Sequence, residues 1–221
     1  MALSQRFTAA CGALTLTLIL AACGGDDTTA TDTGTSSPSA AASSAAPAGA
    51  GEVSEEHNDA DIAFAQMMIV HHRQAIAMAD LAADRAERAE VKNLAEAISA
   101  GQGPEIETMT RFLQAWDAEV PEGTSLDGMG SMDGMDHGGM DMGAMPGAMT
   151  PEMMDQLMAA QGAGFDRMFL EMMTAHHNGA IEMARTEQAG GQNRQALELA
   201  ATIEADQTDE VEQMRQILVA L

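Results

Sequence analysis

Helical periodicity begins near Asn58, and either Asn58 or Asp59 can cap a helix there. Beyond it, apolar side chains recur at three- and four-residue steps. At about 100° per residue, one narrow stripe of this helix contains Phe64, Met67, His71, Ala75, Met78 and Ala82. Met68 and His72 flank the stripe. We therefore predict that His71 faces the core of the protein and that His72 lies at its border.

A second amphipathic segment runs from about Ala89 to Trp116. Its apolar face consists of Val91, Leu94, Ile98, Ile106, Met109, Phe112, Leu113 and Trp116. Gly101, Gly103 and Pro104 interrupt this pattern. Because proline lacks a backbone donor and clashes with the preceding turn, we predict a kink or a break at Pro104.

The chain contains an internal repeat with an offset of 105 residues. The motif Met-Met-x-x-His-His-x-x-Ala-Ile-x-Met-Ala begins at Met67 and again at Met172. At the same offset, the apolar face of the second segment is matched by Leu199, Ile203, Val211, Met214, Ile217, Leu218 and Leu221. The copies, residues 61–116 and 166–221, each predict a helical hairpin with one apolar face. Two such faces bury each other in a four-helix bundle, so we predict an all-α fold.

A segment rich in methionine and glycine, residues 118–149, separates the first hairpin (58–117) from the second (150–221). Frequent glycine disfavours a stable helix, and these methionines have no core to fill. The alternative interpretation of this segment is a low-complexity linker. The second hairpin is expected to open with a short helix, because Thr150 and Pro151 are typical of a helix start.

The first 22 residues have the features of a bacterial lipoprotein signal peptide. A single positive charge is followed by an apolar stretch too short to span a membrane, which ends at Ala21-Ala22-Cys23. We predict that Cys23 is lipidated and that residues 23–57 form a disordered tether. The alternative is an ordinary secretory signal cleaved near Ala22. Because Cys11 lies in the removed part, the mature chain would have no disulfide and no free thiolate.

Charge and side-chain chemistry narrow the function. The net charge of −24 disfavours binding to nucleic acid and to anionic lipid. Thioether and imidazole without thiolate are the ligands of copper, above all of Cu(I), with silver as a chemical mimic. The candidate ligands in the helices are Met67, Met68, His71, His72, Met78, Met172, Met173, His176, His177 and Met183, and those in the Met-rich segment are Met129, Met132, Met135, His137, Met140 and Met142. The alternatives are core packing for the helical methionines and buried, hydrogen-bonded imidazoles for the histidines.

The sequence contains little that indicates an enzyme. A di-iron bundle needs a Glu-x-x-His pair in its helices, and neither histidine pair has one. The chain has no Cys-x-x-Cys-His, no Gly-x-Ser-x-Gly and no phosphate-binding loop. A non-covalent haem held by histidine and methionine stays open as an alternative.

Both copies of the motif resemble the bacterial family known as "domain of unknown function three-oh-five". The matching residues are Asp61, Phe64, Met68, His71, His72, Ala75, Ile76, Met78 and Ala79, and then Asp166, Phe169, Met173, His176, His177, Ala180, Ile181, Met183 and Ala184. The resemblance covers residues 58–221 apart from the Met-rich segment. It implies a ferritin-like helical bundle outside the cytoplasm that binds copper through methionine and histidine.

Together these features predict an extracytoplasmic copper-binding lipoprotein without enzymatic turnover. It would sequester or relay Cu(I) in copper tolerance or homeostasis, and Cu(II) could bind where aspartate and His137 assist. Its expected partners are the metal ion and, through Cys23, the membrane; a copper-transfer protein or a second copy of the chain could be others. The alternatives are a structural or interaction bundle with buried histidine pairs and no metal, and a haem- or metal-dependent redox protein.

Overall fold

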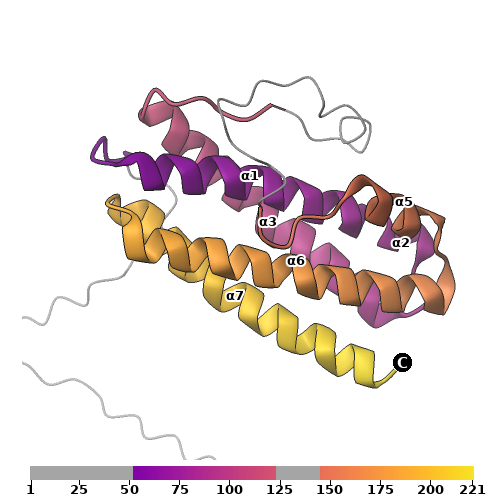
Figure 1. Cartoon of the computed structure of the whole chain (residues 1–221). Helices are drawn as coiled ribbons and strands as arrows, with labels where there is room; N and C mark the ends of the chain where they lie inside the picture. Colours follow the sequence, from indigo (N-terminus) through magenta and orange to yellow (C-terminus); the bar gives the residue numbers. More distant parts are fainter. Residues whose placement is uncertain (1–51, 123–144) are drawn as a thin grey trace, which may run out of the picture. The chain divides into compact units, whose positions relative to one another are not determined.

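The computed structural model describes residues 52–122 and 145–221, and these residues form helices without any strand (Figure 1). The elements in order are α1 (Asp59–Asp80), α2 (Ala82–Arg85), α3 (Ala89–Ala115), α5 (Pro151–Ala159), α6 (Gly162–Gly190) and α7 (Arg194–Val219). The predicted signal peptide, most of the tether and the candidate ligands from Met129 to Met142 lie outside the described residues.

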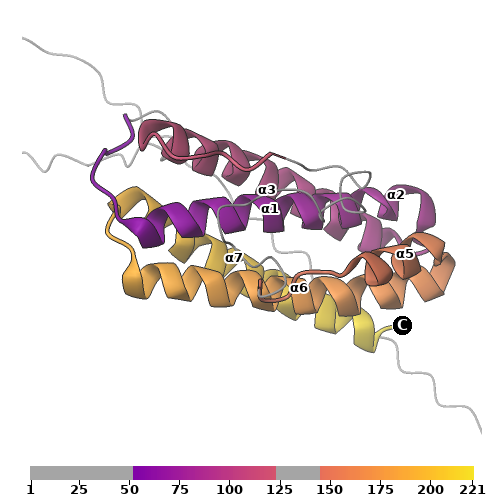
Figure 2. The ribbon, with the colours of Figure 1, turned by 45° about the horizontal axis from the view of Figure 1, so that its top comes forward.

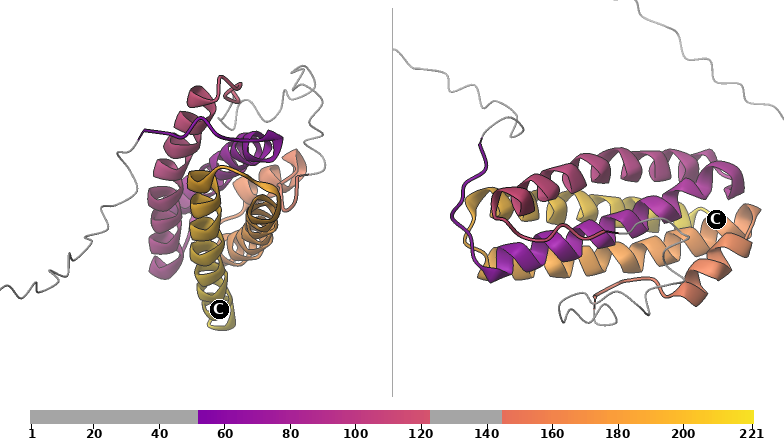
Figure 3. Two further views of the ribbon diagram at one scale, coloured as in Figure 1. Left: turned by 90° about the vertical axis from the view of Figure 1, so that its left-hand side faces the viewer. Right: turned by 90° about the horizontal axis from the view of Figure 1, so that it is seen from above.

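The four long helices form two hairpins that pack on each other. Helix α1 packs along α3, α6 packs along α7, and the hairpins meet mainly where α1 contacts α6. Figure 2 shows α1 beside α3 and α6 beside α7, and the two views of Figure 3 show the same four helices from the side and from above. The predicted all-α four-helix bundle is therefore confirmed.

The predicted helix starts are present with their capping contacts. The Asn58 side chain accepts hydrogen bonds from the backbone N–H groups of Ala60 and Asp61, and the Asp61 carboxylate accepts one from the Asn58 backbone. This reciprocal arrangement is a capping box. Thr150 caps α5, whose first residue is Pro151. Both starts follow from local sequence, so the pattern alone could locate them.

Of the two outcomes predicted at Pro104, a kink or a break, the break is wrong. Helix α3 runs without interruption from Ala89 to Ala115, with Pro104 inside it. The proline removes the hydrogen bond that the Ala100 carbonyl would otherwise accept. Both Ala100 and Pro104 are exposed, so water can bind this carbonyl, and the packing of α3 on α1 keeps the helix intact.

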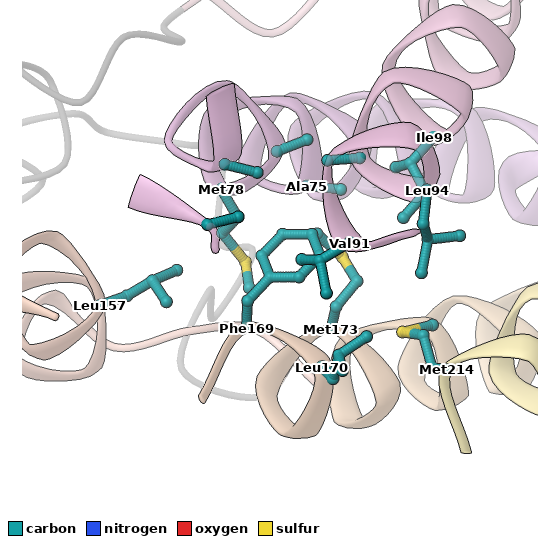
Figure 4. Close-up of a cluster of buried hydrophobic side chains, with 14 of the residues drawn as sticks. Ala75, Met78, Val91, Leu94, Ile98, Leu157, Phe169, Leu170, Met173 and Met214 are labelled. Carbon is teal, nitrogen blue, oxygen red and sulfur yellow. The ribbon is translucent and has the colours of Figure 1, made fainter. Parts of the chain in front are cut away.

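The hydrophobic core is divided into two clusters along the length of the bundle. One cluster, part of which is shown in Figure 4, includes Met78, Ile98, Phe169, Met173 and Met214. The other cluster includes Phe64, Met68, Phe112, Met183 and Ile203. On α1, α3 and α7, a short polar interval separates the residues of one cluster from those of the other.

Each repeat holds the turn of the opposite hairpin with a buried aspartate. Asp166 accepts hydrogen bonds from the backbone N–H groups of Glu87 and Arg88, between α2 and α3. Asp61 accepts them from Gln192 and Asn193, between α6 and α7. These contacts correspond at the offset of 105 residues. They bind the two repeats to each other and thereby fix the face between α1 and α6.

The packed region begins earlier than residue 58, the predicted first residue of the bundle. The Ser54 carbonyl accepts hydrogen bonds from the Trp116 indole and from the Asn193 side chain. The Ser54 backbone N–H donates to the Gln195 side chain. Residues 52–57 therefore belong to the bundle by their contacts.

No helix within the described residues is long and apolar enough to cross a membrane.

Candidate metal centre

A layer of polar side chains lies between the two apolar clusters. It consists of two matching sets, one from each repeat: His71, His72, Gln102 and Glu105, and then His176, His177, Gln207 and Glu210. The histidines and glutamines are buried, and the glutamates reach the surface. We call this set the polar layer. Burying four imidazoles and two amides in a core costs free energy unless their polar atoms form hydrogen bonds or bind a metal ion.

His71 and His176 meet at the contact between α1 and α6. Their ring centroids are 3.6 Å apart and their planes are inclined by 33°. The Nε2 of His71 lies 3.1 Å from the carbonyl oxygen of Pro146. Burial, and then the neighbouring His72, lowers the pKa of His71 to about 3. Burial also holds the pKa of His176 well below its ordinary value. Both rings are therefore neutral near pH 7, with a lone pair available to a metal.

His72 and His177 each pair with a glutamate of their own hairpin. The Nε2 of His72 lies 2.7 Å from Oε2 of Glu105, and the Nε2 of His177 lies 2.7 Å from Oε2 of Glu210. The two histidine side chains are 0% exposed, whereas the glutamates are 17% and 23% exposed. A carboxylate at the edge of the bundle thus holds each fully buried ring.

The polar layer contains buried polar atoms that have no hydrogen-bond partner. They are Nδ1 of His71, His72 and His177, both ring nitrogens of His176, and the side-chain amides of Gln102 and Gln207. Elsewhere in residues 52–122 and 145–221, only the carboxylate of Glu187 shares this property. Native proteins rarely leave buried polar atoms unpaired. This concentration fits a centre that binds a metal ion or ordered water.

Of the methionines on α1, Met78 lies inward as predicted, whereas Met67 and Met68 do not lie where the narrow stripe placed them. Met68 and Met173 are fully buried, and Met78 and Met183 are buried as well. Met67 and Met172 are only partly buried. The prediction that Met68 and His72 lie at the border of the core is therefore wrong, as is the inward position of Met67. The reason is that α1 contacts α3 as well as α6, so its buried arc is wider than a single stripe.

The chain that leaves the Met-rich segment crosses the polar layer. The backbone of Met149 exchanges two hydrogen bonds with the Gln74 side chain, at 2.8 and 3.0 Å. At the matching position of the second repeat stands Gly179, where a Cβ would overlap the Pro146 carbonyl. Gly147 adopts a φ of +71° at this contact, which favours glycine. Residues 145–149, which we call the strap, are thus fixed against the ring of His71 and against the backbone of α6 near Gly179.

Sequence reasoning missed Gln102, Glu105, Gln207, Glu210 and the strap contact of Gln74. The first four occupy matching positions at the offset of 105 residues. Matching polar residues in the two repeats therefore indicated them, whereas matching apolar residues did not. Within the described part of the chain, no three side chains of His, Cys, Asp or Glu are arranged to hold a metal ion. A metal in the polar layer would therefore need a thioether, or a change of rotamers, to complete its ligands.

A family model described as "Domain of unknown function (DUF305)" matches residues 61–218, which span both repeats and the polar layer. The chain belongs to the DUF305 family. The match covers both hairpins, as the resemblance of the motifs implied. No curated protein matches the chain.

Solved structures include several similar proteins. A DUF305 protein from Streptomyces coelicolor, described as secreted, is 28% identical with a TM-score of 0.61, over 73% of this chain and 91% of that one. CopM in its Cu(II)-bound form is 34% identical with a TM-score of 0.57, over 72% of this chain and 96% of that one. CopM in its Cu(I)-bound form is 32% identical with a TM-score of 0.54, over 71% and 93%. Each likeness covers more than two thirds of this chain.

Proposed function

We propose that this DUF305 protein binds copper in the polar layer and holds it for storage or transfer. The observation that carries the proposal is the set of unpartnered nitrogens on four buried histidines at the contact between the repeats. The similarity to CopM, which was solved with Cu(II) and with Cu(I) bound, supports the choice of metal.

The chemistry of the residues favours copper over other common metals. Imidazole suits several transition metals, whereas the addition of thioether selects Cu(I). Met68 precedes His72 by four residues, and Met173 precedes His177 by four, so each pair lies on one face of its helix. Hard cations such as Ca²⁺ and Mg²⁺ prefer oxygen ligands, which the buried part of the layer offers only as two amides.

Cu(I) is the proposed cargo of the bundle, and no turnover is proposed. The Met-rich segment between the repeats is the proposed point of capture, with aspartates and His137 available to Cu(II). The strap is the end of this segment, and its Met145 and Met149 are buried in the two apolar clusters, so the expectation that the methionines of residues 118–149 have no core to fill is wrong for these two.

We further propose that the protein works outside the cytoplasm. The signal peptide and the Ala21-Ala22-Cys23 sequence support export and a lipid anchor at Cys23. The similarity to a Streptomyces coelicolor protein described as secreted supports export alone.

The test is a titration of the mature protein with Cu(I) against a competing chelator. We expect the double variant H71A/H176A to bind at least about tenfold more weakly, which is a loss of about 1.4 kcal/mol. The matched control is H57A, because His57 stacks on Trp116 outside the polar layer. Equal affinity in the wild-type protein and in H71A/H176A would contradict the proposal.

A structural bundle that binds no metal is the second candidate. The close pairs of His72 with Glu105 and of His177 with Glu210 favour it, since each could serve as a structural contact. This candidate predicts that added copper leaves the melting temperature of the wild-type protein unchanged. Haem is disfavoured at the central pair, because ring centroids 3.6 Å apart leave no space for a porphyrin between His71 and His176.

A further inference from the structure

Each long hairpin of the bundle contains a buried histidine paired with a glutamate. His72 on α1 pairs with Glu105 on α3, and His177 on α6 pairs with Glu210 on α7. Both contacts join Nε2 to Oε2 at 2.7 Å, a distance typical of a charge-assisted hydrogen bond. The same geometry at both sites of a duplicated fold shows that it belongs to the repeat and not to one chance rotamer.

The glutamates determine which ring nitrogen carries the proton. An ionised carboxylate can only accept hydrogen bonds, so Nε2 of His72 and Nε2 of His177 must donate. In a neutral imidazole, the other nitrogen then has the lone pair. That atom is Nδ1, and it is buried and without a partner in both residues.

His71 has the same arrangement with a different acceptor. Its Nε2 lies 3.1 Å from the carbonyl oxygen of Pro146, and a carbonyl also only accepts. Its Nδ1 is again buried and unpartnered. Three of the four rings in the polar layer therefore share one tautomer, and only His176 has both nitrogens without a partner.

We infer that Glu105 and Glu210 are positioning residues that present Nδ1 of His72 and Nδ1 of His177 as copper ligands, in addition to the central pair of His71 and His176. The inference rests on the proposed function and specifies which atoms bind. A carboxylate that accepts from the far nitrogen of a ligating histidine fixes the ring orientation and raises the basicity of the near nitrogen. Removing such a partner typically weakens metal binding by about 10- to 100-fold.

The position of the two glutamates fits this role. They are only 17% and 23% exposed, so each carboxylate is partly shielded from water while it contacts a ring that is fully buried. The side chain of Asp206 lies near both, and its pKa is raised by burial and then by the charges of Glu105 and Glu210. Both carboxylates thus lie within electrostatic reach of Asp206, on the side of the bundle formed by α3 and α7.

The first test reads the tautomers in the metal-free protein by ¹⁵N NMR of the histidine rings. We expect the Nε2–H tautomer for His72 and His177 in the wild-type protein and in E105Q/E210Q, because the amide oxygen of glutamine still accepts. In E105L/E210L no acceptor remains, and we expect a mixture of tautomers. The Nδ1–H tautomer in the wild-type protein would overturn the inference, whether or not copper binds.

The second test measures Cu(I) affinity in the same variants against a competing chelator. We expect E105L/E210L to bind about 10- to 100-fold more weakly and E105Q/E210Q to retain most of the affinity. The matched control is E107L/E212L, whose glutamates are exposed neighbours at the same offset of 105 residues. Unchanged affinity in E105L/E210L would overturn the positioning role. If the wild-type protein binds no Cu(I), the proposed function fails, whereas the tautomer measurement still stands.

Discussion

At the scale of single residues, Glu187 departs from the symmetry of the repeat. Its counterpart 105 residues earlier is Ala82, and its carboxyl group is buried beside that of Asp61. Burial, and then Asp61, raises the pKa of Glu187 to about 8. Neither of its oxygens finds a donor, so near pH 7 the proton on Glu187 can be donated to Asp61.

This carboxyl pair makes stability depend on pH. Folded Glu187 keeps its proton up to about pH 8, whereas the unfolded chain releases it near 4.5. Between these values the folded state binds more protons, so the free energy of unfolding should fall as the pH rises. We expect E187Q to remove this contribution, measured by chemical denaturation from pH 5 to pH 9. The control is E182Q, an exposed glutamate of the same helix, and an unchanged slope in E187Q would contradict the assignment.

The central histidines should resist protonation. Burial lowers the pKa of His71 to about 3 and holds that of His176 well below its ordinary value of 6.5. In a ¹H–¹³C NMR titration of the metal-free protein, we expect both rings to keep the shifts of neutral imidazole down to about pH 5. A titration midpoint near 6.5 for either ring would show that the layer is open to water.

At the scale of the elements, the sequence predicted the four long helices because their periodicity and caps are local. It could not predict continuity through Pro104, because that depends on the exposure of Ala100 and on packing against α1. It placed His71 in the core correctly. It placed His72 wrongly, because the contact of α1 with α3 as well as α6 depends on tertiary packing. The contacts of the strap and of Glu105 and Glu210 join residues far apart in sequence, so helical periodicity could not predict these contacts.

The strap contact predicts opposite effects for two glycine substitutions. G179A would push a methyl group into the Pro146 carbonyl, so we expect a loss of about 1–3 kcal/mol of stability from overpacking. The control is G103A in α3, where nothing lies within 4 Å of the added carbon. There alanine should stabilise the helix by about 0.5–1 kcal/mol. Denaturant unfolding measures both, and equal effects of the two substitutions would argue against a packed strap.

At the scale of the whole molecule, duplication explains the divided core. Each repeat contributes two histidines, a glutamine and a glutamate at the same level, and the crossed contacts of Asp61 and Asp166 hold the two copies together. The polar layer therefore contains matching sets of groups from both hairpins. A ligand in the layer would bridge the repeats and stabilise the fold as a unit.

This arrangement predicts that Cu(I) stabilises the protein against unfolding. A ligand that binds only the folded state adds about 2.7 kcal/mol at a free concentration of 100 times Kd. Thermal unfolding with buffered Cu(I) should show this rise in the wild-type protein and little of it in H71A/H176A. An equal rise in both proteins would place the binding site outside the central pair.

The most direct measurement is an anomalous difference map, collected at the copper absorption edge, from crystals of the Cu(I)-loaded mature protein. We expect a peak inside the polar layer, within bonding distance of Nδ1 of His72 or Nδ1 of His177. Copper peaks confined to the surface, with the layer free of metal, would contradict the claim that the buried histidines bind copper.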